Sequence, residues 1–447
     1  MAWNRDRIAA AFIFLGVFIG FRVSPMRTIS DSAFEMMFSQ NLLWHHSFSL
    51  DRSAIPALRP NEAGQIHGSG KKPYQLYQQG ERFYYLYPNG NFILSMPYVA
   101  LANLTGISAA DSEGVYDHRA ETRIETGLAA LLMAGFTVTV FLIGRCLLPL
   151  EWSAFIALAT AFGTQVWSTA SRAMWSHTWG IFILGWVIWM IVRAEVKGTP
   201  LRPLLFGSCV SWLYFVRPTF SISIMAISFY VLLRQRRIFL PFVLTGCVWL
   251  GAFVAFSEYH FSYFLPPYYD WQDFSPSTYW EALAGHFVSP SRGLFVYVPI
   301  VLFVIYLFVR YGPGQRRPLF FLGAGAVTAH FLIISGFRVW WAGHSYGPRL
   351  STDLVPWFAL LAILAVETRL RWRAENPSLD SAARVRLESA VAALLLLASI
   401  VLNGIGASWG GAWSWNYQPT NIDQDQSRLW DWKHPQFLGG SPKKPGG

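Results

Sequence analysis

The feature that most limits what this chain can fold into is a series of long apolar segments separated by short polar ones. About eleven of these segments reach or approach the ~20 residues that a helix needs to cross the hydrocarbon core of a bilayer. They lie near residues 8–24, 120–145, 152–167, 174–193, 203–216, 219–233, 238–257, 294–310, 318–336, 353–368 and 388–407. Only 13% of the residues are charged and 53% are hydrophobic, so lipid must solvate most of the chain. The sequence therefore predicts an all-α polytopic membrane protein with about 11 transmembrane helices.

The positive charge of the chain is explained by membrane topology. The formal net charge is +10, but the basic residues stand at the ends of the apolar segments and form no single patch or arm. We therefore expect no nucleic-acid partner. The three cysteines show neither a CxxC nor a Cys/His spacing, which argues against a disulfide framework and a zinc site.

Lysine and arginine in the short loops predict the orientation in the membrane. Arg5 and Arg7 precede the first apolar segment, which we interpret as an uncleaved signal anchor, and RQRR at 234–237 lies in a loop of the same side. Positively charged loops stay in the cytoplasm, so the N-terminus is expected there. The predicted domains are a transmembrane domain over residues 1–408, which includes an outer, helical loop over 25–118, and an extracytoplasmic tail over 409–447.

The loops expected outside carry many ionisable side chains close to helix ends. They include Asp31, Glu35, Arg172, His177, Arg217, Asp270, Arg292, His344 and Arg349. A single arginine at a helix end is more often an interfacial anchor than a ligand-binding group. Several cations on one face nevertheless predict an anionic ligand. Arg217, Arg292 and Arg349 stand beside proline or glycine, which shape turns, and a guanidinium suits bidentate phosphate binding.

Asp31 begins the stretch SDSAFEMMFSQNLLWHH just after the first apolar segment. One interpretation is that Ser30 or Asp31 caps an amphipathic helix. The residues of that helix expected to face the membrane surface are Phe34, Met37, Phe38, Leu42 and Trp44. The other is a carboxylate that accepts a proton from a substrate hydroxyl as a general base. Glu35 follows one helical turn later on the same face and either assists Asp31 or joins a local network.

The stretch WWAGHSYGPRLSTDLVP (residues 340–356) combines aromatic, charged and turn-forming residues between two apolar segments. Trp340, Trp341 and Tyr346 are candidates for contact with a sugar or an acceptor, since aromatic faces pack on sugars. An interfacial aromatic belt is the alternative explanation. Asp353 is expected to cap the helix that follows.

Taken in serial order, these motifs resemble those of bacterial polyprenyl-phosphate-dependent glycosyltransferases of the GT-C superfamily. The superfamily includes protein O-mannosyltransferase-like and aminoarabinose-transferase-like proteins. The motifs are ISDSAFE, YLYPNGNFILSMP, FVRPTF, SPSRGLFVYVP and WWAGHSYGPRLSTDLVP, and they extend over residues 1 to about 370. Their order, more than any single motif, carries the resemblance.

The resemblance implies an enzyme of the bacterial cytoplasmic (inner) membrane whose active site faces the periplasm. It would transfer a sugar, with inversion, from a polyprenyl-phosphate-linked donor to a glycolipid, a cell-wall or lipopolysaccharide glycan, or a protein. Asp31, with Glu35, takes the catalytic position. The candidates for the donor phosphate are Arg172, Arg217, Arg292, His344 and Arg349, and His177 and Asp270 join the tryptophans and Tyr346 as candidate sugar or acceptor contacts.

The chain departs from the family pattern at Asn89, where some relatives carry a lysine, so that Lys71, Lys72 or Arg82 would have to replace that lysine. We expect no required cofactor and no metal, with a divalent cation held by Asp31, Asp270 and Asp273 as the alternative. Two other functions stay open: a lipid-glycan flippase or transporter, and an enzyme of the O-antigen ligase or polymerase type. A transporter is disfavoured because the sequence shows no internal repeat and almost no charge inside its apolar segments.

Overall fold

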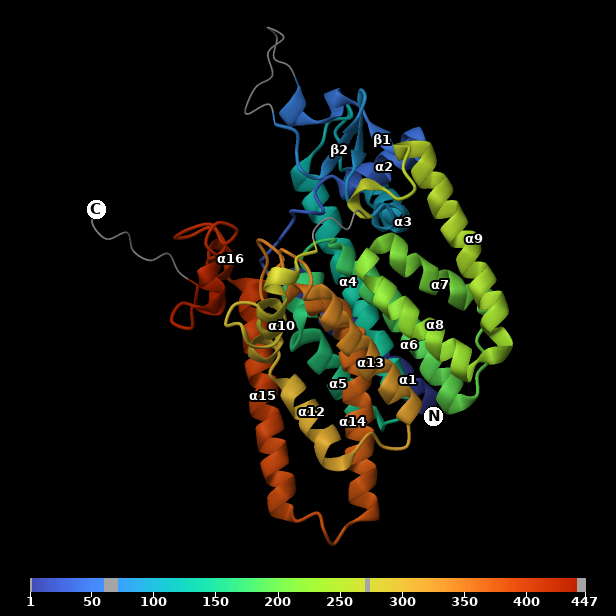
Figure 1. Ribbon diagram of the computed structural model, residues 1–447, viewed down its shortest axis with the longest axis vertical. Coiled ribbons are helices and arrows are strands. Elements are labelled where there is room, and N and C mark those ends of the chain that lie inside the picture. The colour runs from blue at the N-terminus through green and yellow to red at the C-terminus, as the bar shows by residue number, and fades with distance from the viewer. Residues whose placement is uncertain (1, 60–70, 270–273, 440–447) are drawn as a thin grey trace, which may run out of the picture.

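The computed structural model describes residues 2–59, 71–269 and 274–439 as a bundle of helices with a smaller cap at one end (Figure 1). The helices are α1 (Ala2–Val23), α2 (Glu35–His45), α3 (Gly90–Leu104), α4 (His118–Gly144), α5 (Leu150–Phe162), α6 (Ser176–Lys197), α7 (Pro203–Val216), α8 (Ser221–Arg234), α9 (Arg236–Phe261), α10 (Tyr279–Val288), α11 (Leu294–Tyr297), α12 (Ile300–Tyr311), α13 (Arg317–Ile334), α14 (Val355–Glu375), α15 (Ala382–Ser408) and α16 (Gly410–Ser414). The strands are β1 (Ser49–Leu50), β2 (Leu76–Gln79) and β3 (Arg82–Tyr85).

Each predicted apolar segment is helical over most of its length. Within the described ranges, six helices are long and apolar enough to cross a membrane: His118–Gly144, Ser176–Lys197, Arg236–Phe261, Arg317–Ile334, Arg349–Glu375 and Ala382–Ser408. Four apolar helices are shorter: Leu150–Phe162, Pro203–Val216, Pro218–Arg234 and Ile300–Tyr311. A membrane protein is therefore supported, while the count of eleven crossings stays a prediction.

One predicted segment, 294–310, is divided into the short helix α11 and the longer helix α12. Pro299 stands between them, and a proline disfavours helical backbone in the residue before it. Val298 accordingly leaves the helical region, with φ −132° and ψ 57°. The break places a bend close to the end of the bundle that carries the cap.

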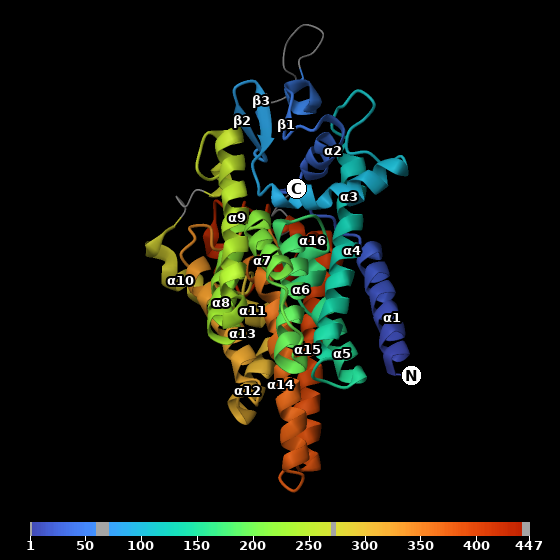
Figure 2. The same cartoon turned by 90° about the vertical axis from the view of Figure 1, so that its right-hand side faces the viewer.

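The cap is formed by the segment between α1 and α4, and it contains a sheet that the all-α prediction missed. β2 and β3 form an antiparallel hairpin in which Leu76 faces Tyr85 and Gln79 faces Arg82, and β1 pairs with the other edge of β3. Helix α3 lies across the end of the bundle, beneath α2 and the strands (Figure 2). The cap lies at the end opposite to the α14–α15 connection (Figure 1).

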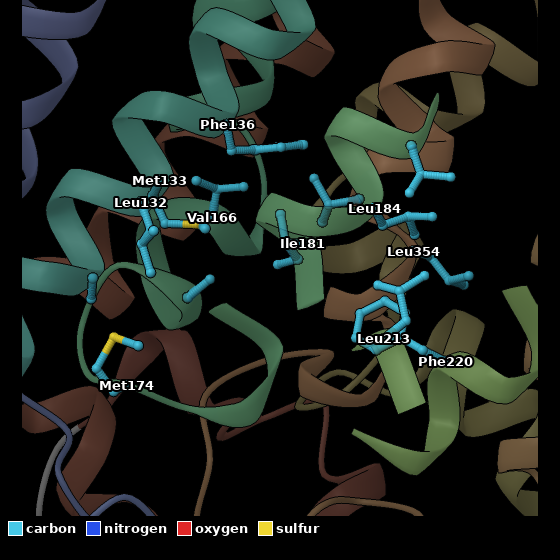
Figure 3. Packing of buried hydrophobic residues seen from close by; sticks show 14 of the residues in the cluster. Leu132, Met133, Phe136, Val166, Met174, Ile181, Leu184, Leu213, Phe220 and Leu354 are labelled. Atoms are coloured by element: carbon cyan, nitrogen blue, oxygen red, sulfur yellow. The ribbon is translucent and has the colours of Figure 1, made fainter. Parts of the chain in front are cut away.

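Helix α4 forms the centre of the packing. The most apolar part of this helix is 78% buried, against 22% for α15 at the edge. Leu132, Met133 and Phe136 of α4 face buried apolar residues of the neighbouring segments, among them Val166 and Ile181 (Figure 3). Because α4 also extends into the cap, it fixes the cap relative to the bundle.

Candidate functional site

A cavity of about 450 Å³ lies where the cap meets the bundle. Asp31 of the cap reaches it from one side, Arg217 from the end of α7, and Arg349 from the 3₁₀ helix η7 (Arg349–Leu354). These three are the charged residues of its lining within the described ranges. The structure thus brings together three predicted site residues that are far apart in the sequence.

Asp31 and Arg349 form an ion pair in this cavity. Arg349 Nη2 lies 2.5 Å from Asp31 Oδ2, and the Tyr74 hydroxyl donates to Asp31 Oδ1 at 3.2 Å. The guanidinium carbon of Arg349 lies 3.7 Å from the ring centre of Trp175, which supports it as a cation–π platform. The Asp31 side chain remains 24% exposed, so it is accessible to a substrate.

The ion pair controls the charge of Asp31. Burial raises the pKa of this carboxyl, but the charge and hydrogen bond of Arg349, with hydrogen bonds from Tyr87 and Tyr74, outweigh burial and lower the pKa below its ordinary value. Asp31 is therefore ionised at neutral pH. An ionised carboxylate is the form that accepts a proton.

Arg217 is held by Asp353. Its Nε donates to Asp353 Oδ2 at 2.8 Å, and the Thr219 hydroxyl donates to the same oxygen at 2.7 Å. His177 Nδ1 lies 2.6 Å from the other oxygen, Asp353 Oδ1. The prediction that Asp353 caps α14 is wrong, because the residue at the cap position is Leu354 and no side chain caps there. Asp353 instead orients the arginine that lines the cavity.

His177 occupies this network and does not reach the cavity. Its side chain is fully buried, and its contact with Asp353 accounts for its burial. It is not among the described residues that line the cavity, so the geometry does not support the predicted sugar contact. Its place in the structure is to support Asp353.

Two glutamates of α4, which the sequence analysis missed, hold the segment that carries Asp31. Glu121 accepts the backbone N–H groups of Phe34 at 2.9 Å and Met36 at 2.8 Å, at the start of α2. Glu125 accepts the Ser32 hydroxyl at 2.7 Å. A carboxylate at a helix N-terminus satisfies free amides and the helix dipole. The signal in the sequence was a pair of glutamates four residues apart at the start of an apolar segment.

The predicted membrane-facing side of α2 is wrong for Phe34, Met37 and Phe38, which are buried, whereas Trp44 is exposed. Phe34 and Phe38 are 6% and 0% exposed and belong to the core, so they do not face a membrane surface. Neither Ser30 nor Asp31 caps the helix, since Phe34 holds the cap position with φ 75°. Asp31 is therefore released from a capping role and turned toward the cavity.

Glu35 lies behind Asp31 in the interior. It is 1% exposed, and the Tyr85 hydroxyl, which donates to the Asp31 carbonyl at 2.8 Å, lies 3.5 Å from Glu35 Oε2. Burial raises the pKa of Glu35 well above its ordinary value, and the nearby carboxylates of Glu125 and Glu121 raise it further. Glu35 is absent from the described lining of the 450 Å³ cavity and reaches only a pocket of about 10 Å³ beside Asp31. The geometry favours the local-network interpretation over direct catalysis.

Arg172, predicted to bind phosphate, donates hydrogen bonds to backbone carbonyls of the chain. It is 2% exposed, and it donates to the carbonyls of Phe21 at 2.6 Å and Ser24 at 3.1 Å. These bonds fix the end of α1 against the segment before α6. The described lining of the cavity does not include Arg172, so its predicted role is not supported.

The remaining predicted residues of the outer loops contact the chain's C-terminal part. Arg292 is 1% exposed and donates to the Trp341 carbonyl at 2.8 Å, and His344 Nε2 lies 2.8 Å from Asn421 Oδ1. Trp340 and Trp341 are buried, and Tyr346 donates to the Leu402 carbonyl at 2.7 Å. These residues lie outside the described lining of the cavity. Their positions therefore do not support the predicted contacts with phosphate and sugar.

The candidates for a replacement lysine lie away from the cavity, and of the three candidates for a metal site only Asp31 is described. Lys71, Lys72 and Arg82 are exposed and do not belong to the described lining of the cavity. Asp270 and Asp273 fall outside the described residues. Within the described ranges, no group of three or more histidine, cysteine, aspartate or glutamate side chains could hold a metal ion. The need for a cation stays untested.

Comparison with known proteins finds a solved structure with a similar fold. No family model matches the chain, and no curated protein matches it. The structure is similar to that of the oligosaccharyltransferase of Archaeoglobus fulgidus tethered with an acceptor peptide, with a TM-score of 0.54 and 12% identity over 98% of this chain and 60% of that one. The apo form of the same protein gives a TM-score of 0.48, at 12% identity over 99% and 61% of the two chains.

The chain therefore shares its overall fold with that oligosaccharyltransferase. The chain spans less than two thirds of the length of the solved structures it matches, and at 12% identity the likeness concerns the fold alone. This likeness of fold agrees with the resemblance seen in the sequence, and membership of the GT-C superfamily stays a prediction. The narrower resemblance to O-mannosyltransferase-like and aminoarabinose-transferase-like proteins stays a prediction.

Proposed function

We propose that this chain is an integral membrane glycosyltransferase that moves a sugar from a polyprenyl-phosphate-linked donor to an acceptor outside the cytoplasm. The observation that carries the proposal is the meeting of Asp31, Arg217 and Arg349 in one cavity at the end of the bundle. One carboxylate and two guanidinium groups are the charges that a base and a phosphate site require. The similar solved structure is an oligosaccharyltransferase with a tethered acceptor peptide, which supports glycosyl transfer on this fold.

Asp31 acts as the general base. The acceptor hydroxyl loses its proton to the Asp31 carboxylate as its oxygen attacks the anomeric carbon, and the bond from that carbon to the phosphate oxygen breaks. Attack from the face opposite the leaving group inverts the configuration. The pair with Arg349 keeps Asp31 ionised and oriented before the acceptor arrives.

Arg349 and Arg217 stabilise the leaving polyprenyl phosphate. Negative charge builds up on the phosphate as the glycosidic bond breaks, and fixed cations in a partly buried cavity stabilise it strongly. Asp353 and Trp175 hold these two guanidinium groups in place, so little reorganisation is needed during the reaction. This division of roles reduces the five predicted phosphate ligands to two.

The aromatic wall of the cavity provides the apolar contacts. Tyr87, Tyr268 and Phe337 line it together with aliphatic residues. Aromatic faces suit a sugar ring or the first isoprene units of the donor. In this proposal they take the place of Trp340 and Trp341, which are buried under the C-terminal part of the chain.

The test is transfer of labelled sugar from a panel of polyprenyl-phosphate donors to native membrane acceptors by the full chain in lipid nanodiscs. We expect transfer with one donor class by the wild type and by the control Asp51→Asn, whose side chain is exposed, and none by Asp31→Asn. Movement of donor lipid across proteoliposomes that survives Asp31→Asn, without transfer from any donor, would overturn the proposal in favour of a flippase.

A further inference from the structure

The C-terminal segment, defined here as residues 409–439, folds onto the loop that leads to Arg349. The two tryptophans of that loop are buried in a separate apolar cluster with residues of the C-terminal segment. The cluster consists of Ala282, Trp340, Trp341, Trp415, Ile422 and Leu429. Figure 1 shows α16 and the chain after it beside the cap-facing end of α15.

Gln436 of the C-terminal segment forms hydrogen bonds with the loop next to Arg349. Its side chain is fully buried. Its Oε1 accepts the backbone N–H of Gly347 at 3.0 Å, and its Nε2 donates to the Ser345 carbonyl at 2.7 Å. The side-chain amide thus accepts from one backbone N–H and donates to one backbone carbonyl of the same turn. Both bonds can form only when the turn has a defined orientation.

The Ser345–Gly347 turn forms a direct hydrogen bond with the backbone of Arg349. Gly347 has φ +59°, and a Cβ atom there would lie 2.8 Å from the Tyr297 ring, so both conformation and space require glycine. The carbonyl of Gly347 accepts the backbone N–H of Arg349 at 2.9 Å. A shift of Gln436 therefore passes to Arg349 through two hydrogen bonds.

Arg292 completes the connection. Its Nη1 donates to Gln436 Oε1 at 2.6 Å, its Nη2 donates to Asn416 Oδ1 at 3.0 Å, and its Nε donates to the Trp341 carbonyl at 2.8 Å. One buried guanidinium therefore ties the loop to two points of the C-terminal segment. Such a network orders the loop only when every donor and acceptor is satisfied.

We propose that Gln436 is a positioning residue, which acts through the Ser345–Gly347 turn to place the Arg349 guanidinium between Asp31 and the donor phosphate. The inference rests on the proposed function for the identity of the ligand. The tie between Gln436 and the loop is independent of that function. Its consequence is that the C-terminal segment belongs to the donor site although it lies outside the described lining of the cavity.

The first test is hydrogen exchange of residues 337–355 in the full chain, held in nanodiscs, with no donor present. Gln436→Ala should speed exchange in this loop and leave the transmembrane helices unchanged. Gln436→Glu keeps an acceptor for Gly347 and Arg292 but turns a second acceptor toward the Ser345 carbonyl, so it should also speed exchange in the loop. The control is Gln424→Ala, an exposed glutamine of the same segment. Unchanged exchange in the loop of Gln436→Ala overturns the proposal.

The second test measures donor affinity. A residue with a purely structural role would not change donor affinity in a way that depends on Arg349. Gln436→Ala should raise the donor KM by about 10- to 100-fold, since small misplacements of binding groups cost this much. In an Arg349→Ala background, Gln436→Ala should add almost nothing to the loss of binding of polyprenyl phosphate. An equal further loss in that background overturns the positioning role. If the wild type binds and transfers no donor, the proposed function fails, and the exchange measurement still decides whether Gln436 orders the loop.

Discussion

The Arg349 guanidinium lies 2.5 Å from the Asp31 carboxylate, although 318 positions separate the two residues. The pair joins the cap to the bundle at the cavity that Arg217 also lines. Asp31 is 24% exposed and Arg349 13%, so both remain within reach of a ligand. In the proposed mechanism, Asp31 of this pair is the base, ionised at neutral pH, and Arg349 is a cation for the donor phosphate.

Replacing Arg349 by lysine tests whether the phosphate site needs a guanidinium. Lysine keeps the positive charge near Asp31 but loses the planar fork and the stacking on Trp175. We expect donor affinity to fall by at least about tenfold, because a charge-assisted hydrogen bond contributes about 1.5–3 kcal/mol. Titration with polyprenyl phosphate measures this. An affinity equal to that of the wild type would show that Arg349 does not contact the phosphate.

The pH dependence of transfer should report the ion pair. Because Arg349 holds the pKa of Asp31 below its ordinary value, Asp31 stays ionised above about pH 5, and it should cause no loss of rate between about pH 5 and 8. Removing Arg349 leaves only the hydrogen bonds from Tyr87 and Tyr74 to oppose the effect of burial, so the pKa of Asp31 should rise. The acidic limb of the rate profile of Arg349→Ala should therefore move to higher pH, and a limb in the wild-type position would contradict the coupling.

Glu121 should stabilise the cap through the start of α2. In Glu121→Gln one carboxylate oxygen becomes an amide N–H₂ that faces a backbone N–H of Phe34 or Met36. A buried unsatisfied donor costs about 1–3 kcal/mol, so thermal unfolding should begin at lower temperature. Glu81→Gln, at an exposed position, serves as the control. Equal melting temperatures for the two variants would show that Glu121 does not hold the helix.

Asp353 should be more important for stability than its position before α14 suggests. Asp353→Asn removes the buried counter-charge of Arg217, and breaking a buried pair in this way costs about 3–5 kcal/mol. Arg217 would lose its orientation, and binding of polyprenyl phosphate should weaken with it. Thermal unfolding and donor titration, compared with Asp51→Asn, test both effects. Unchanged thermal unfolding together with unchanged donor binding would show that Asp353 does not belong to the site.

The positions of the helices were predictable because long apolar segments have few alternatives in a membrane. The sheet of the cap was missed because its strands span only two to four residues, as in Ser49–Leu50, and carry too little periodicity to detect. Asp31, Arg217 and Arg349 were predicted one by one. No pattern in the sequence showed that the cavity would collect these three and leave out Arg172 and Arg292.

The predicted arginines that lie outside the described lining of the cavity share a physical reason. Arg172 and Arg292 look identical in sequence to arginines that bind an anion, but backbone carbonyls of remote segments take up their N–H groups. Glu121 and Glu125 were visible as acids beside an apolar segment. Glu121 accepts backbone amides at the start of α2 and Glu125 accepts the Ser32 hydroxyl, and only the folded chain brings these donors near.

The most direct test of the central claim compares donor binding and sugar transfer in Asp31→Asn. If Asp31 is the base and Arg349 with Arg217 hold the phosphate, the variant should bind the polyprenyl-phosphate donor with nearly wild-type affinity and transfer no sugar above background. Transfer at a rate within a few-fold of the wild type, in a variant shown to be folded, would contradict the claim that Asp31 accepts the proton.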